Sequence, residues 1–186
     1  MRGYATLRKV NTVLSVVMMA LFLLHGVGNA FLVMSFGRPT AKALARAIVA
    51  LAVVHGIIGV GLTVPTVRAM REAGTSYGLL NARFWAVRAS GVAIAVFVAL
   101  HMVVFLQVGG GGPYRLKEYG VFELAVNICL VLSVAVHVLC NARPLVIALG
   151  MSAPRSRAAD FAFVLALLLL LMGVSFVVYF VRWIVI

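Results

Sequence analysis

The sequence predicts an all-α integral membrane protein with five spanning helices. Of its 186 residues, 65% are apolar and only 11% are charged, whereas soluble domains carry about 45 to 50% apolar and about 25% charged residues. The apolar residues gather into five runs long enough to cross a bilayer. These runs lack the alternation of barrel strands, and open strands cannot span lipid because their backbone groups would stay unpaired. A soluble enzyme, a disordered tail and a disulfide scaffold are therefore excluded.

A single membrane domain over residues 1–186 contains the five predicted helices. They cover residues 10–36, 44–67, 84–108, 121–142 and 161–181, and Arg, Lys, Pro or Gly bounds each of them. The first run follows basic residues, as the core of a signal peptide does, but it is far longer than the roughly 7 to 15 residues of such a core. We therefore expect the first helix to be retained.

The fifth run differs from the first four. It contains neither a histidine nor a charged residue, and it is leucine-rich over residues 165–171. A helix that is apolar on all sides either faces lipid or is buried among other helices. We expect it to pack outside a bundle formed by the first four helices.

The basic residues predict the orientation in the membrane. The net charge is +12, and because the basic residues lie between apolar runs, they set topology and meet anionic headgroups or acidic partner surfaces rather than nucleic acid. With the N-terminus inside, ten of the sixteen lie inside and six outside, which favours N-terminus in and C-terminus out. The inner ten are Arg2, Arg8, Lys9, Arg68, Arg71, Arg83, Arg88, Arg143, Arg155 and Arg157, and the outer six are Arg38, Lys42, Arg46, Arg115, Lys117 and Arg182.

The four histidines of the chain are the main functional signal. One lies in each of the first four runs and none lies in a loop; they are His25, His55, His101 and His137. Ionisable residues inside membranes are rare and usually functional. The simpler interpretation is that each histidine is a polar residue that bonds a neighbouring helix. A proton relay is a second interpretation, but Glu123 and Asp160 are the only carboxylates even at the span ends.

The ligand chemistry of these histidines favours haem over zinc. Zinc takes a tetrahedral cluster at one depth, usually with Cys, Asp or Glu. Haem iron instead takes two imidazoles on opposite faces of an apolar macrocycle. Two pairs of histidines predict two haems b, each with two axial histidines, so that the first four helices form a haem-binding four-helix bundle.

Helix geometry predicts which histidines pair. In an up-and-down bundle the diagonal axes are about 13 Å apart, wide enough for an imidazole, an iron and a second imidazole. The diagonal helices are the first with the third and the second with the fourth. We therefore expect His25 and His101 to hold an outer haem, and His55 and His137 to hold an inner haem. Arginines at the span ends are candidate partners of the haem propionates; Arg38 and Arg88 come first, because each is thirteen residues from a proposed ligand, His25 and His101 respectively.

Two local strings carry a resemblance to a known family. They are His25-Gly26-Val27-Gly28-Asn29 and Arg88-Ala89-Ser90-Gly91 followed by His101. Together with five runs and one histidine in each of the first four, the chain resembles the dihaem cytochrome b membrane anchor of succinate dehydrogenases and fumarate reductases, in its single-subunit form. The resemblance covers the whole chain and implies the same haem pairing. It also implies a bacterial-type cytoplasmic membrane.

The resemblance implies partners and a reaction. The partners would be a flavoprotein with covalent FAD, which carries the dicarboxylate chemistry, and an iron–sulfur subunit docked on the inner face, in a heterotrimer or a higher oligomer of it. This chain lacks the cysteine run and the dinucleotide fingerprint that those subunits need. Its own part in the oxidoreductase would be electron transfer to or from a membrane quinone, for which menaquinone is the commoner choice in such members.

A quinone site needs hydrogen-bond donors for two carbonyl oxygens and a proton route. The candidates on the outer side are Gln107, Lys117, Glu118 and Glu123, with Arg38 nearby; an ordinary solvated loop is the alternative. One position departs from the family: some members carry a glutamate two residues before the fourth histidine, whereas this chain has Ala135. If the family resemblance holds, we expect this chain to lack the associated transmembrane proton path.

Two other functions fit the sequence less closely. The first is a haem b anchor of another respiratory dehydrogenase, of hydrogenase or formate dehydrogenase type, which a different partner subunit would reveal. The second is a small transporter whose histidines serve packing or a proton relay. A transporter would bind no cofactor and would need a polar cavity, for which the chain offers few groups at mid-depth.

Overall fold

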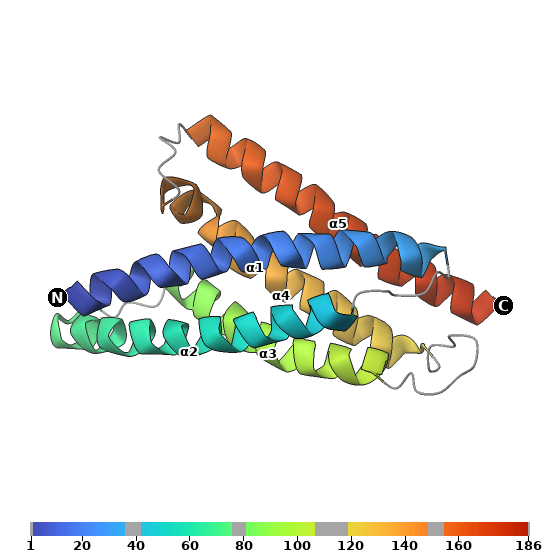
Figure 1. Ribbon diagram of the computed structural model, residues 1–186, viewed down its shortest axis with the longest axis horizontal. Coiled ribbons are helices and arrows are strands. Elements are labelled where there is room, and N and C mark those ends of the chain that lie inside the picture. The colour runs from blue at the N-terminus through green and yellow to red at the C-terminus, as the bar shows by residue number, and fades with distance from the viewer. Residues whose placement is uncertain (1, 36–41, 76–80, 107–118, 149–154, 186) are drawn as a thin grey trace.

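The computed structural model, which describes residues 2–35, 42–75, 81–106, 119–148 and 155–185, consists of five long helices (Figure 1). In chain order they are α1 (Arg2–Met34), α2 (Lys42–Glu72), α3 (Ala82–Leu106), α4 (Val121–Ala148) and α5 (Arg155–Val185). Each is long and apolar enough to cross a membrane, which confirms the prediction of an all-α, multi-pass membrane protein. α1 begins and α5 ends at opposite ends of the bundle (Figure 1).

The helices extend past the predicted apolar runs. Most of the additional residues lie at the helix ends that the distribution of basic residues assigns to the inner side of the membrane. α1 begins at Arg2 rather than at residue 10, and α4 continues through Pro144 to Ala148. Hydropathy marks the part of a helix that lies in hydrocarbon, whereas the backbone stays helical until a residue ends it. At the end of α2 that residue is Gly74, with φ of 63°. Thr75 N–H donates to the Met70 carbonyl and Gly74 N–H to the Arg71 carbonyl, as in a Schellman motif.

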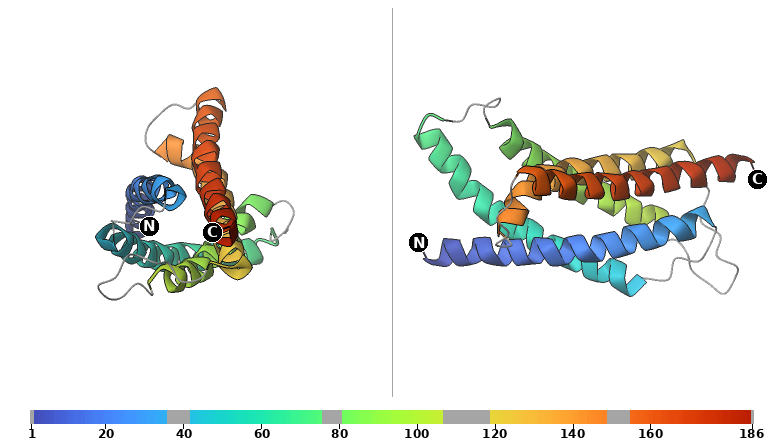
Figure 2. Two further views of the ribbon diagram at one scale, coloured as in Figure 1. Left: turned by 90° about the vertical axis from the view of Figure 1, so that its right-hand side faces the viewer. Right: turned by 90° about the horizontal axis from the view of Figure 1, so that it is seen from above.

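The helices pack as two sequential pairs that α5 connects. α2 lies along α1, α4 lies along α3, and α5 packs on both α1 and α4 (Figures 1 and 2). α5 therefore contributes to the bundle itself, in contrast to the expectation of a helix outside it. Its buried residues recur every three or four positions and so form one stripe that the uniform apolar sequence conceals. They are Leu165, Leu169, Met172, Ser175 and Tyr179.

Two apolar clusters join α5 to its neighbours. One places Leu169 and Met172 against Leu130 and Val134 of α4. The other lies toward the ends of α1 and α5 and surrounds Val33, Tyr119 and Tyr179. There the guanidinium of Arg182 also donates to the carbonyl of Met34, one of the last carbonyls of α1 that no helical N–H reaches.

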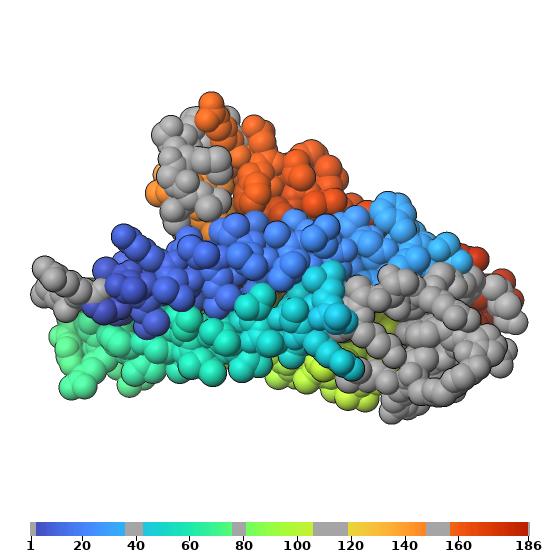
Figure 3. Space-filling model, in the orientation of Figure 1, coloured from blue at the N-terminus to red at the C-terminus, as the bar shows by residue number. Residues whose placement is uncertain are grey.

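The outer surface of the bundle is apolar, as contact with lipid requires. On α2 the exposed side chains include Val53, Ile57, Val60 and Val64, each more than half exposed. Figure 3 shows α1 and α2 side by side along one face of the molecule. Continuous apolar surface of this extent is rare on soluble monomers and normal on a membrane protein.

The close approach of α5 to α1 at Gly26 generates a stability prediction. A Cβ atom there would lie 2.5 Å from Cε and 2.6 Å from Sδ of Met172, whereas a Cβ at Gly28 meets nothing within 4 Å. We expect Gly26→Val to lower the free energy of unfolding by about 1 kcal/mol, at the low end of overpacking costs, because the atoms it displaces are the flexible end of Met172. The measurement is SDS-induced unfolding in mixed micelles, followed by circular dichroism. Gly28→Val is the matched control, and equal losses in the two variants would contradict this packing.

Candidate haem centres

The four histidines project from four different helices. His25 lies on α1, His55 on α2, His101 on α3 and His137 on α4, and all four are partly buried. Within the described residues no group of three or more His, Cys, Asp or Glu side chains comes together. The rings of His55 and His137 meet in a T-shaped contact, and His25 lies within electrostatic range of His101. A ring contact therefore joins the second histidine with the fourth, and the first lies on the same side as the third without a ring contact among those described.

The spacing of His55 and His137 fits two axial ligands of one iron. Their ring centroids are 6.2 Å apart and their ring planes stand at 82°. Two imidazoles on one metal need about 2 Å for each metal–nitrogen bond and about 1 Å from each nitrogen to its ring centre, which gives about 6 Å in total. The two rings come from different helix pairs, since α2 packs along α1 and α4 packs along α3.

The hydrogen bonds of His137 leave its second nitrogen free for a metal. Nδ1 lies 3.0 Å from the Val87 carbonyl oxygen and 3.2 Å from Ser90 Oγ. The carbonyl only accepts, and the Ser90 hydroxyl already donates to Val87 O at 3.1 Å, so Nδ1 must carry the hydrogen. Nε2 then keeps its lone pair. A backbone carbonyl on the second ring nitrogen is the usual support of a metal-binding histidine.

His55 has the same arrangement with a weaker partner. Its Nδ1 lies 3.5 Å from Ser15 Oγ, and the Ser15 hydroxyl donates to the carbonyl of Asn11 at 2.7 Å. Because the hydroxyl hydrogen is used, Ser15 Oγ accepts from Nδ1–H and Nε2 of His55 is free. Both histidines of the inner pair thus present an unprotonated nitrogen, which is the form that ligates iron.

The outer pair has amide partners in place of hydroxyls. Nδ1 of His101 donates to Asn127 Oδ1 at 2.6 Å. Asn29 donates from Nδ2 to the His25 carbonyl at 2.7 Å, and the same Nδ2 lies 3.2 Å from Nδ1 of His25. His25 therefore differs from the other three, because a donor rather than an acceptor faces its Nδ1. In the described part of the chain, Asn29 Oδ1 is buried without a hydrogen-bond partner.

Arg88 lies beside His137 and not beside His101, and its role as a propionate partner stays a prediction. Thirteen residues of helix rise about 20 Å, so Arg88 and His101 lie near opposite ends of α3. The guanidinium of Arg88 stacks 3.6 Å over the Phe84 ring and donates to the Phe84 carbonyl at 3.2 Å. It also lies near enough to His137 to interact with it electrostatically. Any propionate that it holds would belong to the inner centre.

An open hollow of about 340 Å³, lined by both polar and apolar side chains, adjoins Arg88. Its lining includes Asn81, Arg83, Phe84, Asn141 and Pro144. Pro144 has no N–H to give to the carbonyl of Cys140, one turn earlier in α4. Arg83 donates to that carbonyl instead, from Nε at 2.8 Å, and so ties the start of α3 to α4.

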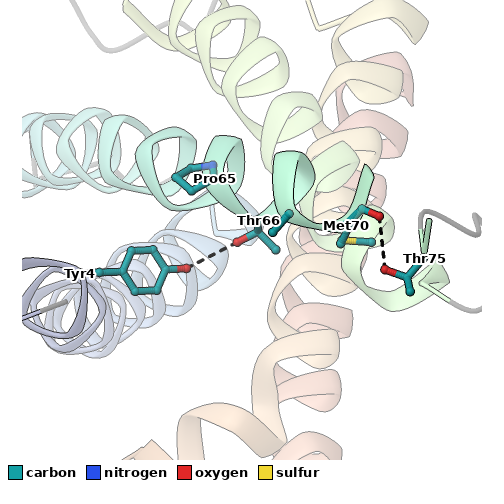
Figure 4. A pocket seen from close by; sticks show the side chains of 6 residues that line it. Tyr4, Pro65, Thr66, Met70 and Thr75 are labelled. Atoms are coloured by element: carbon teal, nitrogen blue, oxygen red, sulfur yellow. Dashed lines mark hydrogen bonds between the residues drawn. The ribbon is translucent and has the colours of Figure 1, made fainter. Parts of the chain in front are cut away.

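A second hollow, of about 500 Å³, lies between α1 and α2 (Figure 4). Tyr4 and Thr66 approach one another across it, with their hydroxyl oxygens 3.4 Å apart. Thr66 is eleven residues beyond His55, about 16 Å along α2. The hollow is therefore separate from the histidine pairs.

The quinone candidates are placed only in part. Arg38, Gln107, Lys117 and Glu118 lie outside the described residues. Glu123 accepts from the N–H of Gly120 at 2.9 Å through Oε2, which caps the start of α4. Its carboxylate therefore has a structural task, and a quinone role for these residues stays a prediction.

The sequence alone did not identify three side chains that contact the histidines, those of Asn127, Ser15 and Ser90. Each is a polar residue in an apolar run, which is a signal in itself because lipid offers such groups no hydrogen bonds. Their link to particular histidines is not local in sequence, since Ser90 and His137 are 47 positions apart and Asn127 and His101 are 26. Spacing within one helix could not reveal these contacts.

Comparisons with family models, with curated proteins and with solved structures found no match to this chain. The resemblance to dihaem membrane anchors therefore rests on the chain's own residues.

Proposed function

We propose that this chain is the dihaem cytochrome b anchor of a membrane complex of succinate dehydrogenase or fumarate reductase type. In this role it passes electrons between an iron–sulfur subunit and a membrane quinone, with menaquinone as the first candidate. The observation that carries the proposal is the contact between His55 and His137, which come from different helix pairs and lie at a separation that fits two ligands of one iron.

The hydrogen bonds of three of the four histidines support the same function, whereas at His25 the donor Nδ2 of Asn29 faces Nδ1. His55, His101 and His137 each use Nδ1 to donate to an oxygen, which leaves Nε2 unprotonated. Haem bound between such nitrogens supplies one-electron Fe(III)/Fe(II) chemistry. The chain's part is to hold the rings in place and to surround them with apolar side chains that exclude water. For His101 those side chains include Phe105 and Phe176, with ring centroids at 4.7 Å and 6.3 Å.

The two centres lie at different levels, as transfer across a membrane requires. His101 is close to the end of α3, whereas His137 lies near the middle of α4 and close to the start of α3 through Val87. The end of the bundle nearest His137 carries Arg83, Arg88 and Arg143. We assign this basic end to the inner face of a bacterial cytoplasmic membrane, with the N-terminus inside and the C-terminus outside. The iron–sulfur subunit, with the FAD-bearing flavoprotein behind it, would dock there.

Haem content is the first test of the proposal. The purified chain, expressed with haem available, is expected to contain about two haems b and to show low-spin bis-imidazole bands in a reduced-minus-oxidised spectrum. The measurement is the haem-to-protein ratio by the pyridine haemochrome assay, on the chain in detergent with any co-purifying subunits. A folded chain without haem would contradict the proposal and favour histidines that serve packing or a proton relay.

Removal of one inner ligand tests the pairing. His137→Ala or His55→Ala is expected to halve the haem-to-chain ratio, because the iron of one centre loses an axial ligand while the other pair is untouched. His101→Ala is expected to remove the other spectral component. Asn141→Ala is the control, because Asn141 donates to the His137 carbonyl at 2.8 Å and to no imidazole that the structure describes. Loss of both haems, or of neither, in the inner variants would argue against this pairing.

A further inference from the structure

The strongest unassigned feature is a buried amide network behind His101. Asn127 is completely buried, at 0% exposure, and Tyr119 beside it is 1% exposed. We infer that Asn127 is the positioning residue of the outer centre, which fixes the orientation and hydrogen-bonded state of His101 and thereby sets the reduction potential of the haem bound there. The inference rests on the proposed function.

The geometry of the amide leaves one arrangement of its atoms. Asn127 Nδ2 has two hydrogens, and it donates to the Glu123 carbonyl at 2.7 Å and to the Tyr119 hydroxyl oxygen at 3.1 Å. Both donors therefore point away from His101, and Oδ1 is the atom that faces the ring, at 2.6 Å from Nδ1. An amide oxygen only accepts, so His101 must keep its hydrogen on Nδ1. Nε2 is then always available to iron.

Tyr119 holds the amide in this orientation. Burial raises the pKa of the Tyr119 phenol well above its ordinary value, so the side chain stays neutral at physiological pH. Its ring packs on Tyr179 of α5, with centroids 5.0 Å apart. A neutral hydroxyl fixed by α5 accepts from Asn127 and polarises the amide, which strengthens the bond from Oδ1 to His101. Asn127, Tyr119 and Tyr179 are all buried, so water does not compete for the amide.

The inner centre has serine hydroxyls and a backbone carbonyl in place of a buried amide. There the closest acceptor of His137 Nδ1 is the carbonyl of Val87, which no substitution removes. Asn127 therefore controls the outer centre alone. A hydrogen bond accepted from Nδ1 increases the basicity of the ligating nitrogen, which stabilises ferric over ferrous iron and lowers the reduction potential.

Substitutions of equal size separate this role from a packing role. Asn127→Leu removes the acceptor and is expected to raise the potential of one haem, with about a tenfold change in the ferric-to-ferrous equilibrium, which is about 59 mV for one electron. Asn127→Asp supplies a stronger acceptor and is expected to shift the same haem in the opposite direction. The other haem keeps its potential in both variants. The readout is a spectroscopic redox titration of the detergent-purified chain, with low-spin ferric EPR signals to identify the haem that responds.

The control is Asn141→Leu, because this asparagine lies on the same helix and bonds only a backbone carbonyl in the described contacts. It should shift neither potential. If Asn127→Leu no longer binds the outer haem, the redox titration of Asn127→Asp is the test. This variant keeps the size of the side chain and an oxygen that accepts from His101. Two bound haems with unchanged potentials in Asn127→Asp, or a shift confined to the haem of His55 and His137, would overturn the inference and leave the proposed function intact. A folded wild-type chain without haem would overturn both.

Discussion

Lipid offers no hydrogen bonds, and this constraint governs the placement of the polar groups inside the bundle. Ser90 gives its hydroxyl hydrogen to a carbonyl of its own helix and turns its lone pair to His137. Asn127 uses both hydrogens of its amide and its oxygen. The partners that satisfy these side chains also fix which nitrogen of His101 and of His137 carries the hydrogen. The hydrogen bonds that lipid makes necessary therefore leave the other nitrogen of each ring with a free lone pair.

The two histidine pairs are built differently, and the difference follows from their neighbours. Around the inner pair, small residues of α3 let the ring of His137 lie against the helix backbone; a Cβ at Gly91 would be 3.5 Å from its Cε1. Around the outer pair, aromatic rings of α3 and α5 contact His101, and Tyr119, before α4, packs on one of them. One environment relies on the backbone and hydroxyls, and the other relies on an amide and stacked rings. Two haems in these sites would not be equivalent.

The sequence predicted the fold and the histidine-bearing helices, because both depend on runs and positions within one helix. It was less informative where contacts join helices. Arg88 was paired with His101 by counting residues, although the same count places them about 20 Å apart. The bond from Arg83 to Cys140 depends on the missing N–H of Pro144, which is visible in the sequence, but the partner lies 57 positions away. The stripe of α5 was hidden because its exposed and buried faces are equally apolar.

The position of α5 also bears on the order of assembly. α1 with α2 and α3 with α4 are pairs of consecutive helices, and each pair can form as it leaves the ribosome. α5 follows both in synthesis and contacts a member of each, through Met172 near Gly26 and through the stripe that faces α4. The two hairpins are therefore joined by the helix that is made after them. If the proposed haems bind between the hairpins, α5 would close the bundle around them only after both hairpins are inserted.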